Sequence, residues 1–408
     1  MSQSIVIVGA GLCGARAAFG LRESGFEGNI TLIGSEVHAP YDRPPLSKQT
    51  LHSEPGLKHI ANPDSYLTSM IDHLAGVEVI DIDREGHEVA LSDGRTFAYD
   101  KLLLAQGASP RMLPGSTGLK NVLTLRTHDD AVAIRDRLGP GRKLIIVGGG
   151  FIGLELAATA RQIGTLVTVV EGLSRLMARA VPSEIAAVVE ERHRQEGVEI
   201  LLDTGVSSIL EADGGIRMPL SDGQELVGDF AVIGIGAVPN TALAEKSGLR
   251  IENGIAVDDF LATSDPDIFA AGDCCSFPLS VYGGVRVRLE SWRCAQDQGA
   301  LVAANMLGKP RPFVGVPWFW SDQYDLTLQI AGLPGVGTST VRRDLGEDAF
   351  LLFHLDEDGR LVAASGVGRG NVVGRDIKLA EMLIAAHAHP RPDDLSAPSV
   401  RLKSLLAA

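Results

Sequence analysis

Two glycine-rich turns constrain this sequence more than any other feature. Each has the spacing GxGxxG, follows a short apolar run and precedes a segment rich in small helix-forming residues. The first turn spans residues 9–14 and the second spans residues 148–153. Their glycines are Gly9, Gly11, Gly14, Gly148, Gly150 and Gly153. In a strand–turn–helix unit such glycines allow a tight turn, close approach of the backbone to a pyrophosphate and close helix packing. The pattern therefore predicts two Rossmann-like dinucleotide-binding units.

An acidic residue after the next apolar run completes each unit. Glu171 ends that run in the later unit, and Glu36 follows it in the earlier unit, behind Gly34 and Ser35. A carboxylate at this place accepts a hydrogen bond from the adenosine ribose 2′-hydroxyl and repels a 2′-phosphate. We therefore expect the later unit to prefer NADH to NADPH, with Arg175 as the nearby residue that could complicate the choice.

Chance is a poor explanation for two such units. The 47 glycines of the chain could produce one GxGxxG at random, but both matches here lie in a complete strand–turn–helix–strand context. Two dinucleotide sites on one chain indicate FAD together with a nicotinamide cofactor and hydride transfer between them.

Length and charge limit the class further. A chain of 408 residues is long enough for two or three domains. Its net charge of −14 disfavours nucleic acid as a partner. The apolar stretches fall short of a membrane span, and the start MSQSIVIVGAG enters a strand with no charged leader, so we expect a soluble cytoplasmic protein. No cysteine and histidine cluster has zinc-like spacing, so no metal is expected.

Further segments carry a resemblance to a known superfamily. They are LLLAQGASPR at 102–111, VIGIGAVPN at 232–240 and DPDIFAAGDC at 265–274. Together with the glycine turns they resemble the two-dinucleotide-binding flavoprotein disulfide reductases, in which an Asp of the last segment holds the FAD. Asp273 takes that position here.

Other stretches narrow the resemblance. PYDRPPLSK at 40–48, ESWRCAQDQG at 290–299 and PWFWSDQ at 317–323 are similar to the NADH-dependent ferredoxin reductases of bacterial dioxygenase and haem-monooxygenase electron-transfer chains. Rubredoxin reductase, putidaredoxin reductase and apoptosis-inducing factor are related to these enzymes. Gln106 and Cys294 depart from the Thr and Asn usual in the family, which puts individual flavin contacts in question.

The resemblance implies the domain organisation. We expect an α/β fold of the glutathione-reductase type, with two Rossmann-like domains for FAD and NAD and a smaller α+β C-terminal domain. The expected ranges are 1–112 and 241–318 for the split FAD domain, 113–240 for the NAD domain and 319–408 for the C-terminal domain. In the last domain, AFLLFHLDEDGRLVAASGV predicts two strands around Asp358 and Gly359, and GRDIKLAEMLIAAHAHP predicts a helix that ends before Pro390.

The cysteines bear on how electrons leave the protein. Relatives that reduce disulfides or peroxide carry a redox cysteine after the first dinucleotide unit, and residues 35–60 contain none. Cys274 and Cys275 are adjacent, and neighbouring Cα atoms lie about 3.8 Å apart, below the roughly 4.4 Å usual for a disulfide. We therefore expect Cys13, Cys274 and Cys275 to be small packed residues. Electrons are then expected to leave the flavin singly, to a ferredoxin with a two-iron, two-sulfur cluster.

The resemblance assigns catalytic roles to Lys48, Glu155 and Trp320. Lys48 is expected to place a positive charge near the flavin, Glu155 to face the nicotinamide and pair with Lys48, and Trp320 to bring an aromatic face to the flavin ring. The alternatives are an ordinary surface lysine, a solvated acid on the first helical turn and a core tryptophan.

The remaining cofactor contacts are implied by the same resemblance. For FAD the residues are Gly9, Gly11, Gly14, Glu36, Arg43, Pro44, Lys48, Ala105, Gly107, Arg111, Asp273, Ser291, Trp292 and Trp320. For NAD the residues are Gly148, Gly150, Ile152, Gly153, Glu155, Glu171 and Gly236.

An acidic ferredoxin needs local positive charge on its reductase. The candidate docking residues are Arg286, Arg288 and Arg293, with Arg369, Arg375 and Lys378 as a second cluster. Scattered solvated charge is the alternative for each.

Three other functions stay open: a rubredoxin reductase, an NADH oxidase or disulfide reductase, and a redox-gated NADH-binding protein similar to apoptosis-inducing factor. The sequence does not distinguish a monomer from a homodimer.

Overall fold

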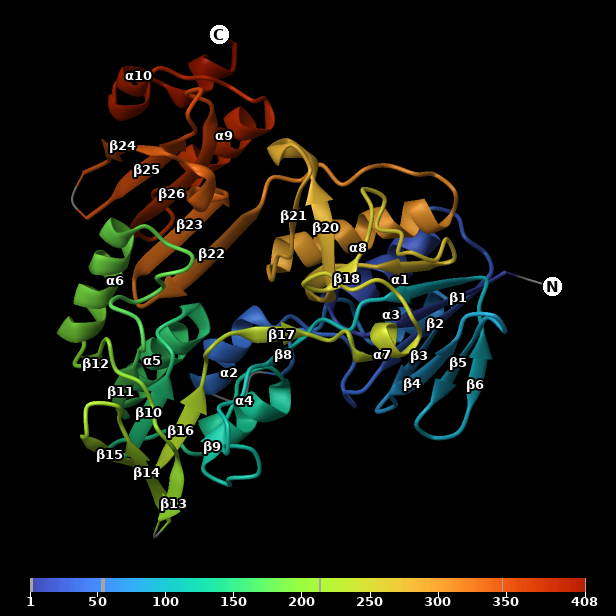
Figure 1. Ribbon diagram of the computed structural model, residues 1–408, viewed down its shortest axis with the longest axis horizontal. Coiled ribbons are helices and arrows are strands. Elements are labelled where there is room, and N and C mark those ends of the chain that lie inside the picture. The colour runs from blue at the N-terminus through green and yellow to red at the C-terminus, as the bar shows by residue number, and fades with distance from the viewer. Residues whose placement is uncertain (1–2, 53–55, 213, 347, 408) are drawn as a thin grey trace. The chain divides into compact units, whose positions relative to one another are not determined.

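The computed structural model describes residues 3–52, 56–212, 214–346 and 348–407. The chain forms two compact units, and each unit is assembled from three separate segments (Figure 1). Unit 1 comprises Met1–Asp42, Leu57–Ser109 and Val238–Gly315, and unit 2 comprises Arg43–Gly56, Pro110–Ala237 and Val316–Ala408. The paired strands β8 (Ala108–Pro110) and β17 (Ala237–Pro239) lie where the chain passes between the units. The three-domain division expected from the sequence stays a prediction.

Unit 1 is built on a parallel sheet with the strand order β19-β7-β1-β2-β3. Its strands are β1 (Ser4–Val8), β2 (Asn29–Gly34), β3 (Ile71–Ala75), β7 (Lys101–Leu104) and β19 (Ile268–Ala270). β1 lies at the centre of the sheet, and Ile5, Val6 and Ile7 are almost completely buried. A strand covered on both faces needs apolar side chains at every position, which explains the unbroken apolar run before the first glycine turn.

The helices α1 (Leu12–Glu23) and α8 (Trp292–Met306) pack against each other in unit 1. A Cβ atom on Gly299 of α8 would lie only 2.5 Å from the carbonyl oxygen of Cys13 on α1, so this close approach needs glycine. The other elements of unit 1 are α3 (Asp64–Thr68), α7 (Ala242–Lys246), and the strands β4 (Val79–Asp83), β5 (Glu88–Leu91), β6 (Thr96–Ala98), β18 (Ile255–Ala256), β20 (Cys275–Leu279) and β21 (Val285–Val287).

Unit 2 contains a second parallel sheet, with the strand order β12-β11-β10-β16-β9. Its strands are β9 (Val122–Leu123), β10 (Lys143–Val147), β11 (Leu166–Val170), β12 (Glu199–Leu201) and β16 (Phe230–Ile233). The helices around it are α2 (Gln49–His52), α4 (His128–Arg135), α5 (Phe151–Ile163) and α6 (Ser183–Gln195), and a small antiparallel sheet is formed by β13 (Leu210–Ala212), β14 (Gly215–Pro219) and β15 (Glu225–Gly228). Gly164 ends α5 in the left-handed conformation, with φ +96°.

The C-terminal part of unit 2 is an antiparallel sheet with the strand order β22-β23-β26-β25-β24. The strands are β22 (Trp318–Gln323), β23 (Leu326–Gly332), β24 (Ser339–Asp344), β25 (Phe350–Leu355) and β26 (Leu361–Arg369). The helix α9 (Gly374–Ala385) packs on β23 and β26, and the short α10 (Pro392–Ser396) follows it (Figure 1). The predicted hairpin around Gly359 and the predicted helix ending before Pro390 are thus confirmed.

The fold class expected from the sequence is confirmed. Each glycine turn lies between the central strand of a parallel sheet and a helix, and the C-terminal part combines an antiparallel sheet with helices. Among the residues that the structure describes, no helix is both long and apolar enough to span a membrane.

Candidate functional site

The glycine turn of unit 1 is closed on its protein side and open on its outer side. Gly9 has φ +114°, and a Cβ atom on it would collide with the carbonyl oxygen of Ala105. A Cβ atom on Gly14 would collide with the carbonyl oxygen of Gly9. By contrast, a Cβ atom on Gly11 would meet nothing within 4 Å. The free space therefore lies where the chain enters α1.

This turn fits the pyrophosphate of a dinucleotide. Gly11 is the N-cap residue of α1 and has no side chain to satisfy the first backbone N–H groups of the helix. Such uncapped N–H groups, at the positive end of the helix dipole, bind phosphate. Glu36, the acid expected on the ribose, lies just beyond β2 and accepts a hydrogen bond from the hydroxyl of Tyr41.

Other residues expected to contact FAD lie in the same unit. Gly107 has φ +68°, and its carbonyl oxygen accepts from the backbone N–H of Asn240 at 3.0 Å. Asp273 lies in a short 3-10 turn whose first residue, Gly272, donates its backbone N–H to Gln298 Oε1 at 2.7 Å. This turn is therefore anchored to α8, which positions the Asp273 backbone.

The start of α8 places two more of the expected FAD residues. Ser291 is the N-cap residue, and its hydroxyl accepts from the backbone N–H of Cys294 at 3.3 Å. The indole N–H of Trp292 donates to Asp42 Oδ1 at 2.8 Å. The orientation of Trp292 is thus fixed by an acid that the sequence analysis did not single out.

Gln106 and Cys294, the two departures from the family pattern, are both inside unit 1. Cys294 is buried in α8. Gln106 Oε1 is buried and has no hydrogen-bond partner among the described residues. A buried amide oxygen without a donor is costly, so a polar group of a bound cofactor would satisfy it. Gln106 is therefore compatible with the FAD that the turn fits.

The cysteines are free, buried thiols. The set comprises Cys13, Cys274, Cys275 and Cys294. Burial raises the pKa of each thiol above its usual range, to about 11 for Cys274. Since the thiolate is the reactive form, these residues have little redox reactivity.

The glycine turn of unit 2 repeats the geometry of the first. Gly148 has φ +108°, and a Cβ atom on it would lie 2.5 Å from the carbonyl oxygen of Gly234. A Cβ atom on Gly153 would lie 2.5 Å from the carbonyl oxygen of Gly148, whereas the nearest atom to one on Gly150 is 3.9 Å away. Gly150 is the N-cap residue of α5, so this turn also fits a pyrophosphate.

Glu171 is held by the backbone beside this turn. Its two carboxylate oxygens accept from the N–H groups of Gly149, at 2.7 Å, and Leu173, at 2.9 Å. The guanidinium of Arg175 instead donates to the carbonyl oxygens of Ala178, at 2.9 Å, and Val181, at 2.8 Å. The carboxylate is therefore held beside the turn, while Arg175 is committed to its own loop; the expected contact of Glu171 with a ribose stays a prediction.

Further residues expected at the cofactors belong to unit 2. Ile152 lies on the first turn of α5 and is 50% exposed. The backbone N–H of Arg111 donates to the carbonyl oxygen of Gly236 at 2.9 Å. The guanidinium of Arg43 donates to the carbonyl oxygen of Arg126, and Pro44 follows as the first residue of a 3-10 turn.

Lys48 and Glu155 form an ion pair inside unit 2. Lys48 Nζ lies 2.5 Å from Glu155 Oε2, and Glu155 is only 5% exposed. The same carboxylate accepts from the hydroxyl of Ser47, at 2.5 Å to Oε2, and from that of Ser321, at 2.7 Å to Oε1. A buried carboxylate needs such compensation, and it receives it from two serines that the sequence analysis did not single out.

Trp320 is half-buried on β22. Its ring stacks on that of Trp318, with 5.3 Å between centroids and 23° between planes, and its indole N–H donates to Asp322 Oδ2 at 3.1 Å. A stacked and hydrogen-bonded indole has a fixed orientation. Its expected contact with the flavin stays a prediction.

The arginines expected to dock a ferredoxin are each paired with an acid in unit 1. Arg286 lies 3.6 Å from Glu252, and Arg293 lies 3.6 Å from Asp297. Arg288 pairs with Glu290 and has a side chain only 14% exposed. In the second cluster, Arg369 pairs with Asp325 and Lys378 with Glu381. These pairings reduce the net positive potential of both clusters.

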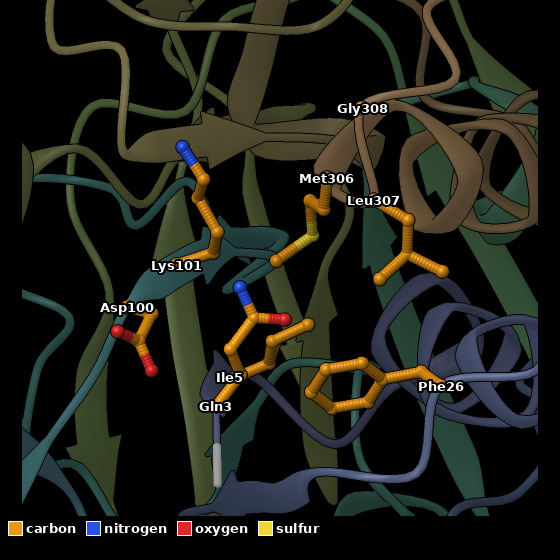
Figure 2. Close-up of a pocket in the computed structure, with 8 residues that line it drawn as sticks. All are labelled: Gln3, Ile5, Phe26, Asp100, Lys101, Met306, Leu307 and Gly308. Atoms are coloured by element: carbon orange, nitrogen blue, oxygen red, sulfur yellow. The ribbon is translucent and has the colours of Figure 1, made fainter. Parts of the chain in front are cut away.

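A cavity of about 240 Å³ in unit 1 is separate from these features (Figure 2). Its lining includes Ile5 near the start of β1, Lys101 at the start of β7 and Met306 at the end of α8. The cavity thus lies at the amino ends of the parallel strands, whereas dinucleotides bind at the carboxyl ends. It is not the dinucleotide site.

Sequence reasoning missed the polar residues that support the buried charge pair. Ser47 and Ser321 lie in motifs that were recognised, next to Lys48 and Trp320, but nothing in the motifs marks them as partners of Glu155. Adjacency to a predicted site residue was the available signal.

Comparisons with known proteins cover the whole chain. Residues 3–299 match the family described as pyridine nucleotide-disulphide oxidoreductase, and residues 318–406 match the reductase C-terminal family. The chain is 42% identical to the ferredoxin–NAD(+) reductase component of the anthranilate 1,2-dioxygenase system of Burkholderia cepacia, over 99% of this chain and 100% of that protein. It is 37% identical to putidaredoxin reductase of Pseudomonas putida, over 100% of this chain and 97% of that protein.

A solved structure of a related protein also matches this chain over nearly its whole length. A crystal structure of a covalent putidaredoxin reductase–putidaredoxin complex matches with a TM-score of 0.93 and 36% identity, over 99% of this chain and 98% of that chain.

Proposed function

The chain belongs to the pyridine nucleotide-disulphide oxidoreductase family, and we propose that it works as the NADH-dependent ferredoxin reductase of an oxygenase system. It is an oxidoreductase of the ferredoxin–NAD(+) reductase type that uses FAD and NAD(H), and both glycine turns fit these dinucleotides. When bound, FAD supplies the change from two-electron to one-electron transfer that an iron–sulfur acceptor requires. The partner we propose is a ferredoxin with a two-iron, two-sulfur cluster.

The burial of the cysteines is the observation that carries the choice among redox functions. A disulfide or peroxide reductase needs a reactive thiol, and the thiols here have raised pKa values and lie inside unit 1. Because no accessible thiol is available in the described chain, electrons are proposed to leave from the flavin.

Each unit has a proposed share of the chemistry. In unit 1, the open turn at Gly11 is proposed to hold the FAD pyrophosphate and Glu36 its ribose. In unit 2, the turn at Gly150 is proposed to bind NADH, with Glu171 on the adenosine ribose. Arg175 already donates to its own loop, which supports NADH over NADPH.

The ion pair of unit 2 is proposed to serve the nicotinamide half of the reaction. Glu155 lies five residues along α5 from Gly150, and its carboxylate holds the ammonium group of Lys48. A fixed pair of opposite charges orients a polar carboxamide and offsets charge that develops during electron transfer.

NADH is a cytoplasmic cofactor, so the proposed place of action is the cytoplasm.

The ferredoxin is proposed to dock near Arg288 and Arg293. Both lie beside the predicted flavin segment that includes Ser291 and Trp292. An acidic ferredoxin would compete with Glu290 and Asp297 for these guanidinium groups, so we expect a modest contribution from each.

Anaerobic titration with NADH tests the central proposal. The purified holoprotein is titrated to the end point of the flavin spectrum and the electrons taken up per FAD are counted. Uptake of about two electrons is expected, because the flavin is then the sole redox group. Uptake of about four electrons would mean that a dithiol also cycles, and the protein would be a disulfide or peroxide reductase.

A second measurement tests the acceptor. The reduced holoprotein is mixed with a two-iron, two-sulfur ferredoxin, and bleaching of the cluster absorbance is followed. Fast bleaching that depends on the ferredoxin concentration is expected. If reduced flavin reoxidises only with oxygen, the protein is an NADH oxidase.

A further inference from the structure

A chain of buried polar side chains continues from Glu155 into the C-terminal sheet of unit 2. The hydroxyl of Ser321, which donates to Glu155 Oε1, itself accepts from Gln323 Nε2 at 3.1 Å. Gln323 Oε1 in turn lies 2.8 Å from Nε2 of His193 on α6. Ser321, Gln323 and His193 are at most 1% exposed. The chain therefore runs through buried side chains from α6, through β22, to Glu155 on α5.

The hydrogen bonds of this chain have one direction. Burial lowers the pKa of His193 to about 4, so its imidazole is neutral near pH 7 and carries one N–H. Gln323 Oε1 accepts hydrogen bonds and cannot donate them, which assigns that N–H to Nε2. His193 Nδ1 is buried with no partner among the described residues, as an unprotonated nitrogen in an apolar setting would be. Each donor thus points toward the Glu155 carboxylate.

A chain with this direction delivers its last hydrogen bond to the Glu155 carboxylate. Each N–H or O–H in the series polarises the next, and the last one is aimed at a carboxylate. Glu155 Oε1 receives this bond, while Oε2 receives Ser47 and Lys48. Each oxygen therefore has its own hydrogen-bond partners, and together these partners fix the rotation of the carboxylate.

The outer end of the chain is also anchored. The ring of Tyr324 packs edge-on against His193, with 5.0 Å between centroids, and the guanidinium of Arg192 lies 4.9 Å from the centroid of the same ring. Arg192 also donates to Asp325 Oδ1 at 3.0 Å. The turn after β22 is therefore clamped to α6, which leaves Gln323 little freedom to rotate.

We propose that Ser321, Gln323 and His193 are positioning residues, which hold the Glu155 carboxylate and its partner Lys48 in the orientation needed for reduction of the flavin by NADH. The inference rests on the proposed function, since it concerns the nicotinamide half of that reaction. None of the three residues was singled out by motif or by resemblance. Their effect is transmitted through Glu155.

The same sheet offers a matched control. His354 on β25 is a second buried histidine with a pKa lowered by burial to about 4, and its Nε2 lies 3.2 Å from the hydroxyl of Ser365 on β26. Ser365 is completely buried, as Ser321 is. This pair is not hydrogen-bonded to Glu155, so Ser365→Ala measures what loss of a buried hydroxyl does to the fold alone.

The experiment compares Ser321→Ala, Ser321→Thr and Gln323→Glu with Ser365→Ala in the FAD-loaded protein. Stopped-flow mixing with NADH gives the limiting rate of flavin reduction and the Kd for NADH separately. In Ser321→Ala the limiting rate should fall about tenfold, the equivalent of one hydrogen bond to a charged group, while the Kd changes little. Ser321→Thr keeps the hydroxyl and should retain the rate, and Ser365→Ala should leave both constants unchanged.

Gln323→Glu tests the direction of the chain. The new carboxylate accepts from His193 and also from the Ser321 hydroxyl, so that hydroxyl no longer donates to Glu155. The limiting rate should fall as in Ser321→Ala, and the double variant should show no further loss. If Gln323→Glu does not fold, Ser321→Ala and Ser321→Thr still decide the matter.

The inference would be overturned by equal limiting rates in Ser321→Ala and Ser365→Ala, or by a loss in Ser321→Thr as large as in Ser321→Ala. It would also be overturned if 15N NMR of histidine-labelled protein found His193 protonated on Nδ1, a measurement that needs no NADH. A wild-type flavin that NADH does not reduce would instead contradict the proposed function itself.

Discussion

The two glycine turns have similar backbone geometry, but the side chains in the helices that follow them differ. Gly9 and Gly148 have φ +114° and φ +108°, and a Cβ atom on either would collide with a carbonyl oxygen of a neighbouring strand end. The helices that follow differ. α1 buries Cys13 and alanines against α8, whereas α5 buries Glu155 with its charge. The glycine pattern thus determines where a phosphate fits, and the residues beyond it determine what else the site does.

The acids that follow the second strand differ in a similar way. Glu36 accepts from a side chain, the hydroxyl of Tyr41, whereas Glu171 accepts from two backbone N–H groups. Glu171, the acid proposed to bind NADH, is therefore held by the turn itself, which suits a cofactor that binds and leaves in each cycle.

Alanine at the first glycine of each turn should have the largest effect. Gly9→Ala and Gly148→Ala combine a left-handed φ with a collision against backbone, a cost of about 3 kcal/mol or more. Gly9→Ala should be purified without FAD, as read from the ratio of flavin to protein absorbance. Gly148→Ala should keep its FAD and lose reduction by NADH.

A positive-φ glycine in open space is the control for that comparison. Gly94 has φ +88° and no atom within 4 Å of a Cβ position, so Gly94→Ala should cost only the backbone strain, about 1 kcal/mol. If Gly9→Ala retains FAD as Gly94→Ala does, the first turn does not hold the cofactor.

The acids should give the next largest effect, each on its own cofactor. Glu171→Ala removes the acceptor proposed for the ribose and leaves two backbone N–H groups unpaired, so the KM for NADH should rise tenfold or more, about 1.5 kcal/mol. The ratio of NADH to NADPH activity should fall as well. Glu36→Ala should instead weaken FAD retention. A KM for NADH that responds equally to both changes would contradict the assignment of the two units.

Acidic pH should destabilise unit 2. The pKa values of His193 and His354 are lowered by burial from 6.5 to about 4, so the folded state binds fewer protons than the unfolded state. Their stabilising contribution is complete above pH 6.5 and is lost as the pH falls toward 4. Between pH 7 and pH 5 the loss should be about 2 kcal/mol for each histidine.

Thermal unfolding at several pH values checks this prediction. His354→Phe should be less stable at pH 7, because Ser365 loses its partner, but the fall in Tm between pH 7 and pH 5 should be smaller than in the wild type. An unchanged pH dependence in this variant would mean that His354 does not titrate with unfolding.

Charge reversal at the proposed docking surface should have the smallest effect. Arg293→Glu should raise the KM for ferredoxin severalfold, about 1 kcal/mol, and weaken its dependence on salt, while NADH reduction of the flavin stays unchanged. Arg95→Glu is the matched control, since Arg95 is also paired with an acid on the surface of unit 1. If both variants raise the KM equally, the effect is one of net charge and the docking surface lies elsewhere.

Local patterns in the sequence were sufficient for the fold class. The apolar run at 5–8 became the central strand of one parallel sheet and the run before residue 148 became that of the other. The hairpin around Gly359 and the helix at α9 were also predictable, because periodicity and turn residues act over a few positions. The pairing of Lys48 with Glu155 was expected, but its burial was not.

By itself, the sequence determined the two glycine-rich turns, the acids beside them and the absence of a cysteine at 35–60, because each is a property of neighbouring residues. Only the tertiary structure decided what surrounds Glu155. Ser321 lies 166 positions from it, and Gln323 lies 130 positions from His193. Such contacts form when separate helices and strands pack, and a buried charge selects its polar partners from whatever the fold brings within hydrogen-bond distance.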